Sequence, residues 1–342
     1  MQLACVSTYH FICHFSCIMK NKNVCKKLIM VVKYEQVMME FFRKESDIYM
    51  EKAGLVLEGG GMRGAYTAGL LAAFMDEGIT FPYVIGVSAG ANNGANFIAR
   101  QKDRGKKVFV DYVVDKRFSG LKNIIKEKTY FGMDFLFDVL PNKLAPFDYK
   151  TFHNSSTVFK VGVTDCKTGK PIYLRHHDFD PHIFMEKVLR ASSSLPLISK
   201  PVDIDGRKYL DGGISDPIPI EKSVQDGNRY NVVVLTRNAG YRKEASKVNM
   251  LVKRSISKYP NLLETLKQRH NTYNETLDKI DTLQGEGDVY VFRPKKEIIV
   301  DRLERDIDKL DDLYKQGYNE TMEEMEKFKM WLNGLDIVNY CE

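Results

Sequence analysis

The stretch Gly86-Val87-Ser88-Ala89-Gly90 decides how this chain is expected to fold. It follows a short apolar run at residues 81–85 and leads into a segment of small residues at 91–99. This pattern predicts a strand, a sharp turn and a helix, with the Ser88 hydroxyl held out at the helix N-terminus. The flanking Gly86 and Gly90 would let the strand and the helix approach closely. A plain glycine-rich loop in which Ser88 only caps the helix fits the same residues, so the rest of the sequence must decide.

A second glycine-rich turn comes earlier in the chain. Residues 53–58 are apolar and predict a buried parallel strand, and Gly59-Gly60-Gly61-Met62-Arg63-Gly64 follows before an expected helix over 65–75. Such a loop aims several backbone N–H groups at one point, with the helix dipole behind them. It suits a phosphate, and it equally suits the oxyanion of a tetrahedral acyl intermediate.

The spacing of these glycines also satisfies the G-x-G-x-x-G pattern of dinucleotide-binding proteins. That pattern requires an acidic residue at the end of the second strand, where it binds the ribose. Here the second strand ends in Gly86-Val87-Ser88, and Asp76 and Glu77 lie earlier, at the end of the helix. The dinucleotide interpretation therefore lacks its specificity element, although a nucleotide-binding regulatory protein stays open as an alternative from another functional class.

Two hairpins are expected downstream. Residues 157–164 and 171–174 flank a polar turn, and residues 202–210 fold back around Asp205-Gly206. The second hairpin delivers Asp211-Gly212-Gly213 at its end. An acid between an apolar strand and two glycines is either a turn former or a positioned carboxylate.

Between and after these hairpins the chain alternates helix and strand. Asp180 is expected to cap a helix with Pro181 at its first position. That helix leads to a serine cluster at 191–196. Its hydroxyls would either hydrogen-bond near the site or belong to a capped loop stopped by Pro196, and we favour the capped loop for each serine. Residues 231–236 predict one more buried strand, which completes an α/β alternation.

Length, composition and charge narrow the class of protein. The 342 residues can hold one large α/β domain and an appended region, and the net charge of +6 is mild. No basic run with interleaved aromatics indicates a nucleic-acid partner. Four of the six cysteines lie within the first 25 residues, so no disulfide framework is expected in the folded part, which suits the cytoplasm. A set of Cys13, Cys17, His10 and His14 does not match zinc spacing, and no metal site is expected.

The two ends of the chain are expected to differ from its centre. Residues 1–49 lack the basic start and cleavage site of a secretory signal and are marginal for a membrane span, so we predict an extension outside the fold, with Met50 as the natural start. A weak membrane anchor is the alternative. Residues 50–245 would form the core, and residues 246–342 a mainly helical region that packs on it, with a late strand at 288–292.

Three of these motifs, in this order, resemble those of the patatin-like phospholipase family of lipid acyl hydrolases. Residues 59–64 are similar to its oxyanion loop, Gly86–Gly90 to its nucleophile elbow, and Asp211-Gly212-Gly213 to its catalytic box. The likeness covers about residues 53–240, and the tail beyond 260 resembles that of bacterial patatin-family proteins. It implies a three-layer α/β/α core with a mostly parallel central sheet and a helical C-terminal extension.

The resemblance also implies a mechanism built on a Ser–Asp dyad. Ser88 would attack an ester carbonyl and Asp211 would take its proton, while the N–H groups of the Gly60-to-Met62 region hold the oxyanion. Arg63 would assist electrostatically, bind phosphate or pair with a carboxylate. An ordinary aspartate pKa of about 3.9 makes a weak base, and desolvation would raise it. The order Ser88, Asp211, His270 allows a triad, but His270 lies in a polar helical stretch where a solvated histidine is expected.

The function expected from this likeness is hydrolysis of lipid esters by a phospholipase A or lysophospholipase type of activity. No metal or organic cofactor is expected. The partners would be a lipid or acyl-ester substrate and, transiently, a membrane surface. A general carboxylesterase or thioesterase with the same dyad is the alternative enzyme, and a noncatalytic lipid-binding protein is a further one.

Overall fold

The computed structural model describes residues 53–127, 129–245 and 248–338. Within them, eight strands form one sheet in the order β5-β6-β3-β2-β1-β7-β8, with β4 also paired to β3. The strands are β1 (Ala53–Leu57), β2 (Tyr83–Val87), β3 (Val158–Asp165), β4 (Pro171–Arg175), β5 (Val202–Ile204), β6 (Arg207–Asp211), β7 (Tyr230–Val234) and β8 (Val289–Phe292).

The sheet is parallel through its centre and antiparallel at one end. Strands β3, β2, β1, β7 and β8 run parallel to their neighbours in that row. The pairs β3–β4, β3–β6 and β5–β6 are antiparallel, and two of them are the hairpins that the sequence predicts. Because β1, β2 and β7 are buried on both faces, their near-continuous apolar composition is what a parallel centre requires. The expectation of a mostly parallel α/β sheet is confirmed.

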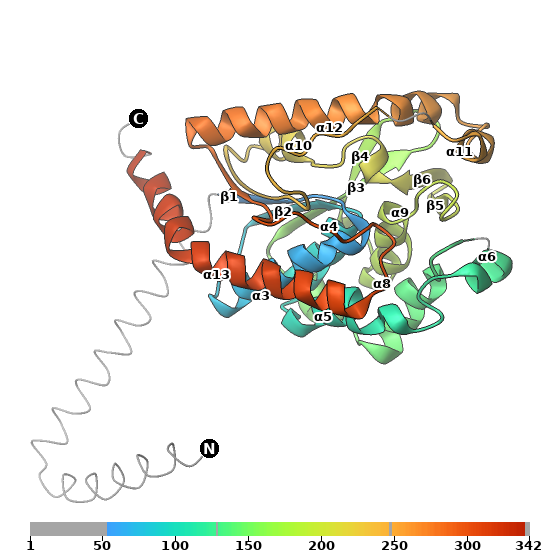
Figure 1. Cartoon of the computed structure of the whole chain (residues 1–342), viewed down its shortest axis with the longest axis horizontal. Helices are drawn as coiled ribbons and strands as arrows, with labels where there is room; N and C mark the ends of the chain where they lie inside the picture. The colour runs from blue at the N-terminus through green and yellow to red at the C-terminus, as the bar shows by residue number, and fades with distance from the viewer. Residues whose placement is uncertain (1–52, 128, 246–247, 339–342) are drawn as a thin grey trace, which may run out of the picture. The chain divides into compact units, whose positions relative to one another are not determined.

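Helices cover both faces of this sheet (Figure 1). The α-helices of the described residues are α3 (Gly64–Asp76), α4 (Ala89–Ile98), α5 (Lys102–Phe109), α6 (Leu121–Glu127), α7 (Tyr149–Asn154), α8 (Pro181–Ile183), α9 (Arg190–Ser192), α10 (Ile220–Gln225), α11 (Met250–Ser255), α12 (Pro260–Glu286) and α13 (Ile307–Val338). Short 3-10 and π-helical segments are η1 (Gly61–Arg63), η2 (Asp111–Val114), η3 (Phe135–Leu144), η4 (His176–Asp178), η5 (Phe184–Leu189) and η6 (Gly212–Ile214).

Alternate residues of the central strands separate two apolar cores. Leu55 and Leu57 of β1 pack into the larger core with α3, α4 and α13. Val56 between them faces the other side and packs with Tyr273 and Ile280 of α12. Figure 1 shows the same arrangement, with α10 and α12 on one side of the sheet and α3, α5 and α13 on the other. The predicted three-layer α/β/α architecture is confirmed.

The C-terminal region belongs to both the sheet and the helical layers. Strand β8 extends the sheet by pairing with β7, and α13 packs along α3. Phe328 of α13 stacks on Phe74 of α3 with ring centroids 5.3 Å apart, and Phe292 of β8 meets Phe74 edge-on at 5.4 Å. The described residues all belong to one compact unit.

Several expectations concern residues that the structure does not describe. Residues 1–49, including the cysteine and histidine set near the N-terminus, lie outside the described residues. Within the described ranges, no helix combines the length and the apolar character needed to cross a bilayer. Those same ranges contain no group of three or more histidine, cysteine or acidic side chains placed to bind a metal ion.

Candidate active site

The turn between β2 and α4 holds Ser88 in a backbone conformation that residues other than glycine rarely adopt. Its φ is 54° and its ψ is −122°, a conformation that costs about 1–3 kcal/mol. The glycines beside it are required sterically. A Cβ on Gly90 would lie 2.4 Å from the carbonyl oxygen of Leu57, and one on Gly86 would lie 2.8 Å from the nitrogen of Ala91. The sharp strand-to-helix turn predicted from the sequence is therefore present.

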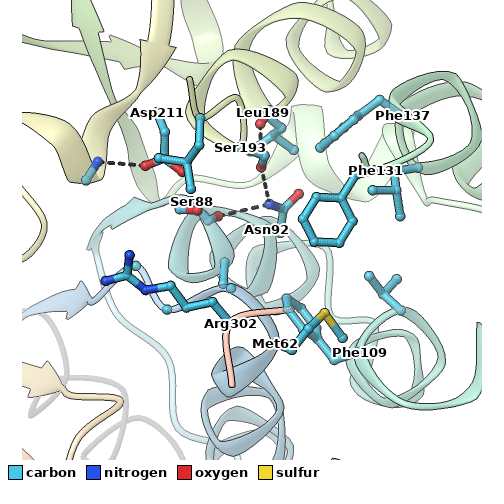
Figure 2. A pocket seen from close by; sticks show the side chains of 18 of the residues that line it. Met62, Ser88, Asn92, Phe109, Phe131, Phe137, Leu189, Ser193, Asp211 and Arg302 are labelled. Carbon is cyan, nitrogen blue, oxygen red and sulfur yellow. Dashed lines mark hydrogen bonds between the residues drawn. The ribbon is translucent and has the colours of Figure 1, made fainter. Parts of the chain in front are cut away.

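Asp211 ends strand β6 directly beside this serine. The Ser88 side chain lies beside the Asp211 carboxyl (Figure 2), which accepts a 2.7 Å hydrogen bond from the Gly213 N–H. Asp211 is buried, and burial raises the pKa of its carboxyl above the ordinary aspartate value, although the neighbouring Ser88 hydroxyl, the Gly213 N–H and the charges of Arg269 and Arg302 oppose the shift. Such a carboxylate is a stronger base than an exposed aspartate.

Gly212 supports the position of Asp211 by allowing close contact with the neighbouring strand. A Cβ on Gly212 would lie 2.3 Å from the Gly162 carbonyl oxygen on β3. The main chain of Asp211 is also fixed, because its N–H donates to the Ser194 carbonyl oxygen over 2.7 Å. The Asp-Gly-Gly box is thus held on both sides, which keeps the carboxylate aimed at the serine.

The glycine-rich loop between β1 and α3 borders the same space. Gly59, Gly60, Gly61 and Met62 line a cavity together with Ser88. The Gly59 N–H donates to the Pro217 carbonyl oxygen at 3.2 Å, and the Met62 N–H donates to the Arg302 carbonyl oxygen at 3.1 Å. Among the described residues, the N–H groups of Gly60 and Gly61 have no such acceptor. Of the predicted oxyanion loop, these two N–H groups are therefore the best placed to receive a developing negative charge.

Arg63 and Gly64, which the sequence also assigns to the oxyanion loop, lie behind the cavity wall. Gly64 allows close packing on helix α4, since a Cβ at position 64 would lie 2.8 Å from the Cβ of Ala89. Arg63 is 3% exposed, and burial, followed by the charges of Arg237 and Arg302, lowers the pKa of its guanidinium to about 10. Both residues support the loop from inside the fold.

The cavity itself has a volume of about 280 Å³ and is mostly apolar. Figure 2 shows Ser88 and Asp211 side by side, with Phe131 and Phe137 on one side of them and Arg302 on the other. Its apolar wall comes from α5 and the segments that follow it, including Val108, Phe109, Phe118, Phe131, Met133, Leu136, Phe137, Met185 and Leu189. Most of these aromatic side chains are buried in the main apolar core and also form part of the cavity wall.

No histidine lines the cavity among the described residues. His270 on α12 is hydrogen-bonded to the Lys267 carbonyl oxygen of its own helix at 3.1 Å. His176 is buried beside Phe152 and Phe159, and burial lowers its pKa to about 4. The arrangement around Ser88 thus provides a carboxylate and no imidazole.

Comparison with known protein families identifies the domain that holds this site. Residues 55–223 match the model of the patatin-like phospholipases. The chain carries a patatin-like phospholipase domain. A second match, at residues 259–333, is to a domain of unknown function named DUF6363, which includes most of α12 and α13.

The patatin-like domain also has curated relatives. The chain is 32% identical over 196 residues to the uncharacterized protein YjjU of Escherichia coli, covering 54% of this chain and 52% of YjjU. It is 24% identical over 303 residues to lysophospholipase NTE1 of Meyerozyma guilliermondii, covering 82% of this chain but 20% of that protein. Among solved structures, it is similar to VipD of Legionella pneumophila with a TM-score of 0.42 and 14% identity, over 83% of this chain and 67% of VipD.

The serine cluster of the patatin-like domain takes the role that the sequence interpretation treated as the less favoured alternative. The Ser192 hydroxyl accepts a 2.8 Å hydrogen bond from the Ser88 N–H and donates to the Gly162 carbonyl oxygen over 2.7 Å. The Ser193 hydroxyl accepts from the Asn92 amide, which also donates to the Ser88 carbonyl oxygen at 2.9 Å. Both the N–H and the carbonyl oxygen of Ser88 are therefore hydrogen-bonded to side chains, which stabilises its strained conformation. The interpretation as a loop merely stopped by Pro196 was incomplete.

Two arginines from beyond the patatin-like domain complete the site. Arg269 on α12 donates from its Nε to the Gly213 carbonyl oxygen, and it lines the cavity together with Arg302 from the segment before α13. The Arg302 carbonyl oxygen also packs against the glycine loop. Gly61 is required at this contact, because its φ is +60° and a Cβ there would lie 2.6 Å from that oxygen. Neither arginine belongs to a recognisable motif, so no sequence signal reveals that either reaches the site.

Proposed function

We propose that this protein is a serine-dependent lipid acyl hydrolase of the phospholipase A or lysophospholipase type. The observation that carries the proposal is the position of the Ser88 side chain beside the buried Asp211 carboxyl at an apolar cavity (Figure 2). A strained serine beside a base whose pKa is raised is the arrangement expected of an activated nucleophile. The name of the fungal relatives, lysophospholipase, supports the same chemistry.

The proposed reaction runs in two halves through an acyl-enzyme. The Ser88 Oγ attacks the ester carbonyl carbon while its proton passes to Asp211, and the carbonyl oxygen becomes an oxyanion facing Gly60 and Gly61. Collapse of this intermediate breaks the ester bond, and the departing alcohol takes the proton from Asp211. Water then attacks the acyl-Ser88 ester, giving its proton to Asp211, and the released serine recovers that proton as the carboxylic acid leaves.

The shape of the cavity favours a substrate with one acyl chain. Its volume of about 280 Å³ lies near the lower end of small-molecule pockets, and its wall beyond Ser88 is aromatic and aliphatic. A single hydrocarbon chain can occupy this space, whereas two chains would compete for it. We therefore expect monoacyl lipids to be hydrolysed faster than their diacyl counterparts.

The test is labelling by a fluorophosphonate probe together with hydrolysis of a monoacyl lipid. Ser88→Ala should abolish labelling and lower kcat/KM at least about 10³-fold, because the nucleophile is lost. Ser255→Ala, which removes an exposed serine on α11, is the matched control and should keep both. Labelling that survives in Ser88→Ala would contradict the proposal.

Two other functions would give different results in these assays. A carboxylesterase or thioesterase with the same dyad would be labelled at Ser88 but would prefer short soluble esters to monoacyl lipids. A nucleotide-binding regulatory protein would bind a dinucleotide saturably and would not react with the probe. The hydrogen bond from the Met62 N–H to the Arg302 carbonyl oxygen argues against the nucleotide, because it occupies a donor that a phosphate would need.

A further inference from the structure

A second cavity lies next to the acyl cavity and is lined largely by residues from beyond the patatin-like domain. Its volume is about 260 Å³, and its basic lining comprises Lys243, Lys267, Arg269, His270 and Arg302. Arg269 and Arg302 line both cavities, so their side chains lie between the two. The proposed reaction centre and this basic cavity are therefore neighbours.

Most of the lysine and arginine side chains in and around this second cavity lack an ion-pair partner in the described structure; Lys267, which pairs with Glu264, is the exception in its lining. Among the described residues, none of the cations Arg63, Arg237, Lys243, Arg269 and Arg302 forms an ion pair with a carboxylate. The buried Nε atoms of Arg63 and Arg237 also lack a hydrogen-bond acceptor. Grouping unpaired cations away from water is costly unless an anion joins them.

Asp211 is close enough to Arg269 and Arg302 for their charges to affect its pKa, but it forms no ion pair with either in the described structure. The other nearby carboxylates are engaged elsewhere or unpaired. Glu58 accepts a hydrogen bond from the Thr236 N–H at 2.5 Å and another from the Tyr273 hydroxyl at 2.9 Å. Glu244 lines the second cavity but pairs with none of these cations in the described structure. The pKa of Lys243 is lowered to about 7. Burial is the largest cause, and repulsion by the charges of the neighbouring arginines adds to it; these are Arg269, Arg302, Arg63 and Arg237.

The order of groups along the cavities matches a lipid with a charged headgroup. In Figure 2, Arg302 lies on the opposite side of Ser88 from Phe131 and Phe137. A substrate whose acyl chain lies among the phenylalanines would direct the alcohol part of its ester toward Arg302. Guanidinium groups bind phosphate oxygens through two parallel hydrogen bonds, which a neutral alcohol cannot accept in the same way.

We propose that the cavity between Arg269, Arg302 and Lys243 binds the phosphate of the substrate headgroup, so that the enzyme selects glycerophosphate esters over neutral glycerides. This inference rests on the proposed hydrolase function and adds to it the residues that recognise the headgroup. The C-terminal region would then set specificity, while the patatin-like domain supplies the nucleophile and its base.

The test compares two lipids that share one acyl ester and differ in the phosphate. Oleoyl lysophosphatidic acid and monooleoylglycerol are presented in the same mixed micelles, and the ratio of their kcat/KM values is measured. Arg302→Gln and Lys243→Gln should each lower this ratio at least about tenfold, because each removes a charged partner of the phosphate. Arg242→Gln is the matched control, since Arg242 adjoins Lys243 but pairs with Asp278 at the surface. Its ratio should equal that of the wild type.

A binding measurement separates failure of this inference from failure of the hydrolase function. Ser88→Ala should bind glycerol 3-phosphate in calorimetry, and Ser88→Ala with Arg302→Gln should bind it at least about tenfold more weakly. Absence of binding, or an unchanged lipid ratio in an active enzyme, would overturn the headgroup assignment alone. Inorganic phosphate that binds Ser88→Ala as tightly as glycerol 3-phosphate, with the lipid ratio unaffected, would indicate a free-anion site and would also overturn it. Binding without hydrolysis of either lipid by the wild type would contradict the hydrolase function and keep the phosphate site.

Discussion

Asp211 is buried, yet the proposed mechanism requires its carboxylate to be ionised so that it can accept the Ser88 proton. Its side chain is 2% exposed, and burial raises its pKa despite the neighbouring Ser88 hydroxyl, the hydrogen bond from the Gly213 N–H and two nearby arginines. A group whose pKa is higher in the folded state than in the unfolded chain stabilises the fold fully only below its unfolded pKa. That contribution is lost as the pH rises through the folded pKa. Near neutral pH the ionised carboxylate therefore reduces stability, in the state in which the proposed mechanism needs it as the base.

Replacing this carboxylate should separate stability from activity. Asp211→Asn is expected to lower kcat/KM at least about 10³-fold and to raise the Tm at pH 7, since the amide carries no charge to desolvate. The gain in Tm should shrink as the pH falls toward the unfolded aspartate pKa, because both proteins are then uncharged at this position. Differential scanning calorimetry at several pH values measures it. A Tm below that of the wild type at pH 7 would show that the charge stabilises the fold.

The pH dependence of the reaction should report the same group. Because Asp211 must be ionised to accept a proton and its pKa is raised, kcat/KM should fall on the acid side at a higher pH than for an ordinary aspartate. The charge of Arg302 lowers this pKa, so Arg302→Gln should move the acid limb to higher pH. A soluble neutral ester is the substrate to use, with Arg242→Gln as control. An acid limb that stays in place in Arg302→Gln would exclude this coupling.

At the scale of elements, glycines set how closely α3 and α13 pack. A Cβ on Gly69 would lie 1.9 Å from the Tyr314 carbonyl oxygen, and one on Gly317 would lie 2.1 Å from the Tyr66 carbonyl oxygen. Backbone atoms occupy both places, so neither contact can be relieved by turning a side chain. The two helices can therefore approach at this crossing only because glycine occurs on each of them.

Two glycine substitutions on α13 should change stability in opposite directions. Gly317→Ala is expected to lower the free energy of unfolding by about 1–3 kcal/mol or more, because the helix must move away from α3. Gly334→Ala, with nothing within 4 Å of its added Cβ, should raise it by roughly 0.5–1 kcal/mol. Urea unfolding of both variants gives the comparison. Equal effects of the two substitutions would mean that the crossing tolerates a methyl group.

Most of the central elements were predictable because their residues decide their structure locally. The buried strands, both hairpins and the Asp180 cap follow from apolar runs, turn residues and an Asp-Pro pair. The π-helical segments η3 and η5 were not predicted, since the extra residue in each turn is stabilised by packing that no short motif encodes. Likewise, a serine that bonds to a distant main chain looks the same in sequence as one that bonds to its own loop.

At the scale of the whole molecule, the C-terminal region is part of the fold that carries the site. Strand β8 extends the sheet, and Leu310, Leu313, Phe328 and Leu332 of α13 are buried in the main core. Burying each such side chain contributes about 1.5–3 kcal/mol. Together these four contributions are comparable to the whole net stability of a typical domain, which is about 5–15 kcal/mol.

Shortening the chain at its two ends should therefore have unequal effects. A chain that ends at residue 245 is expected not to fold, since it loses β8, α12 and α13 together with Arg269 and Arg302. A chain that begins at Met50 should fold and keep its activity, if residues 1–49 lie outside the fold as predicted. Circular dichroism melting and fluorophosphonate labelling test both. A cooperative melt of the chain that ends at residue 245 would show that residues 53–245 form an independent domain.

Only those site residues that lie within short sequence motifs could be predicted from the sequence. Ser88, Asp211 and the glycine loop lie in compact motifs, because each requires small residues beside it for steric reasons that leave a pattern. Arg269 and Arg302 lie on a long helix and in an irregular segment, and only the folding of the tail back over the sheet brings them to the cavity. Long-range contacts of this kind leave no local pattern in a single sequence.

The contact between the glycine loop and Arg302 has a consequence for synthesis of the protein on the ribosome. Ser88 and Asp211, the proposed nucleophile and base, are made long before the Arg302 carbonyl group that contacts the loop, and chains grow at about 5–20 residues per second. A nascent chain therefore carries the serine for some seconds without a finished oxyanion site, and we expect it to be unable to attack the membranes around it. Ribosome-bound chains stalled before and after residue 338 would reveal this as probe labelling that begins only in the longer ones.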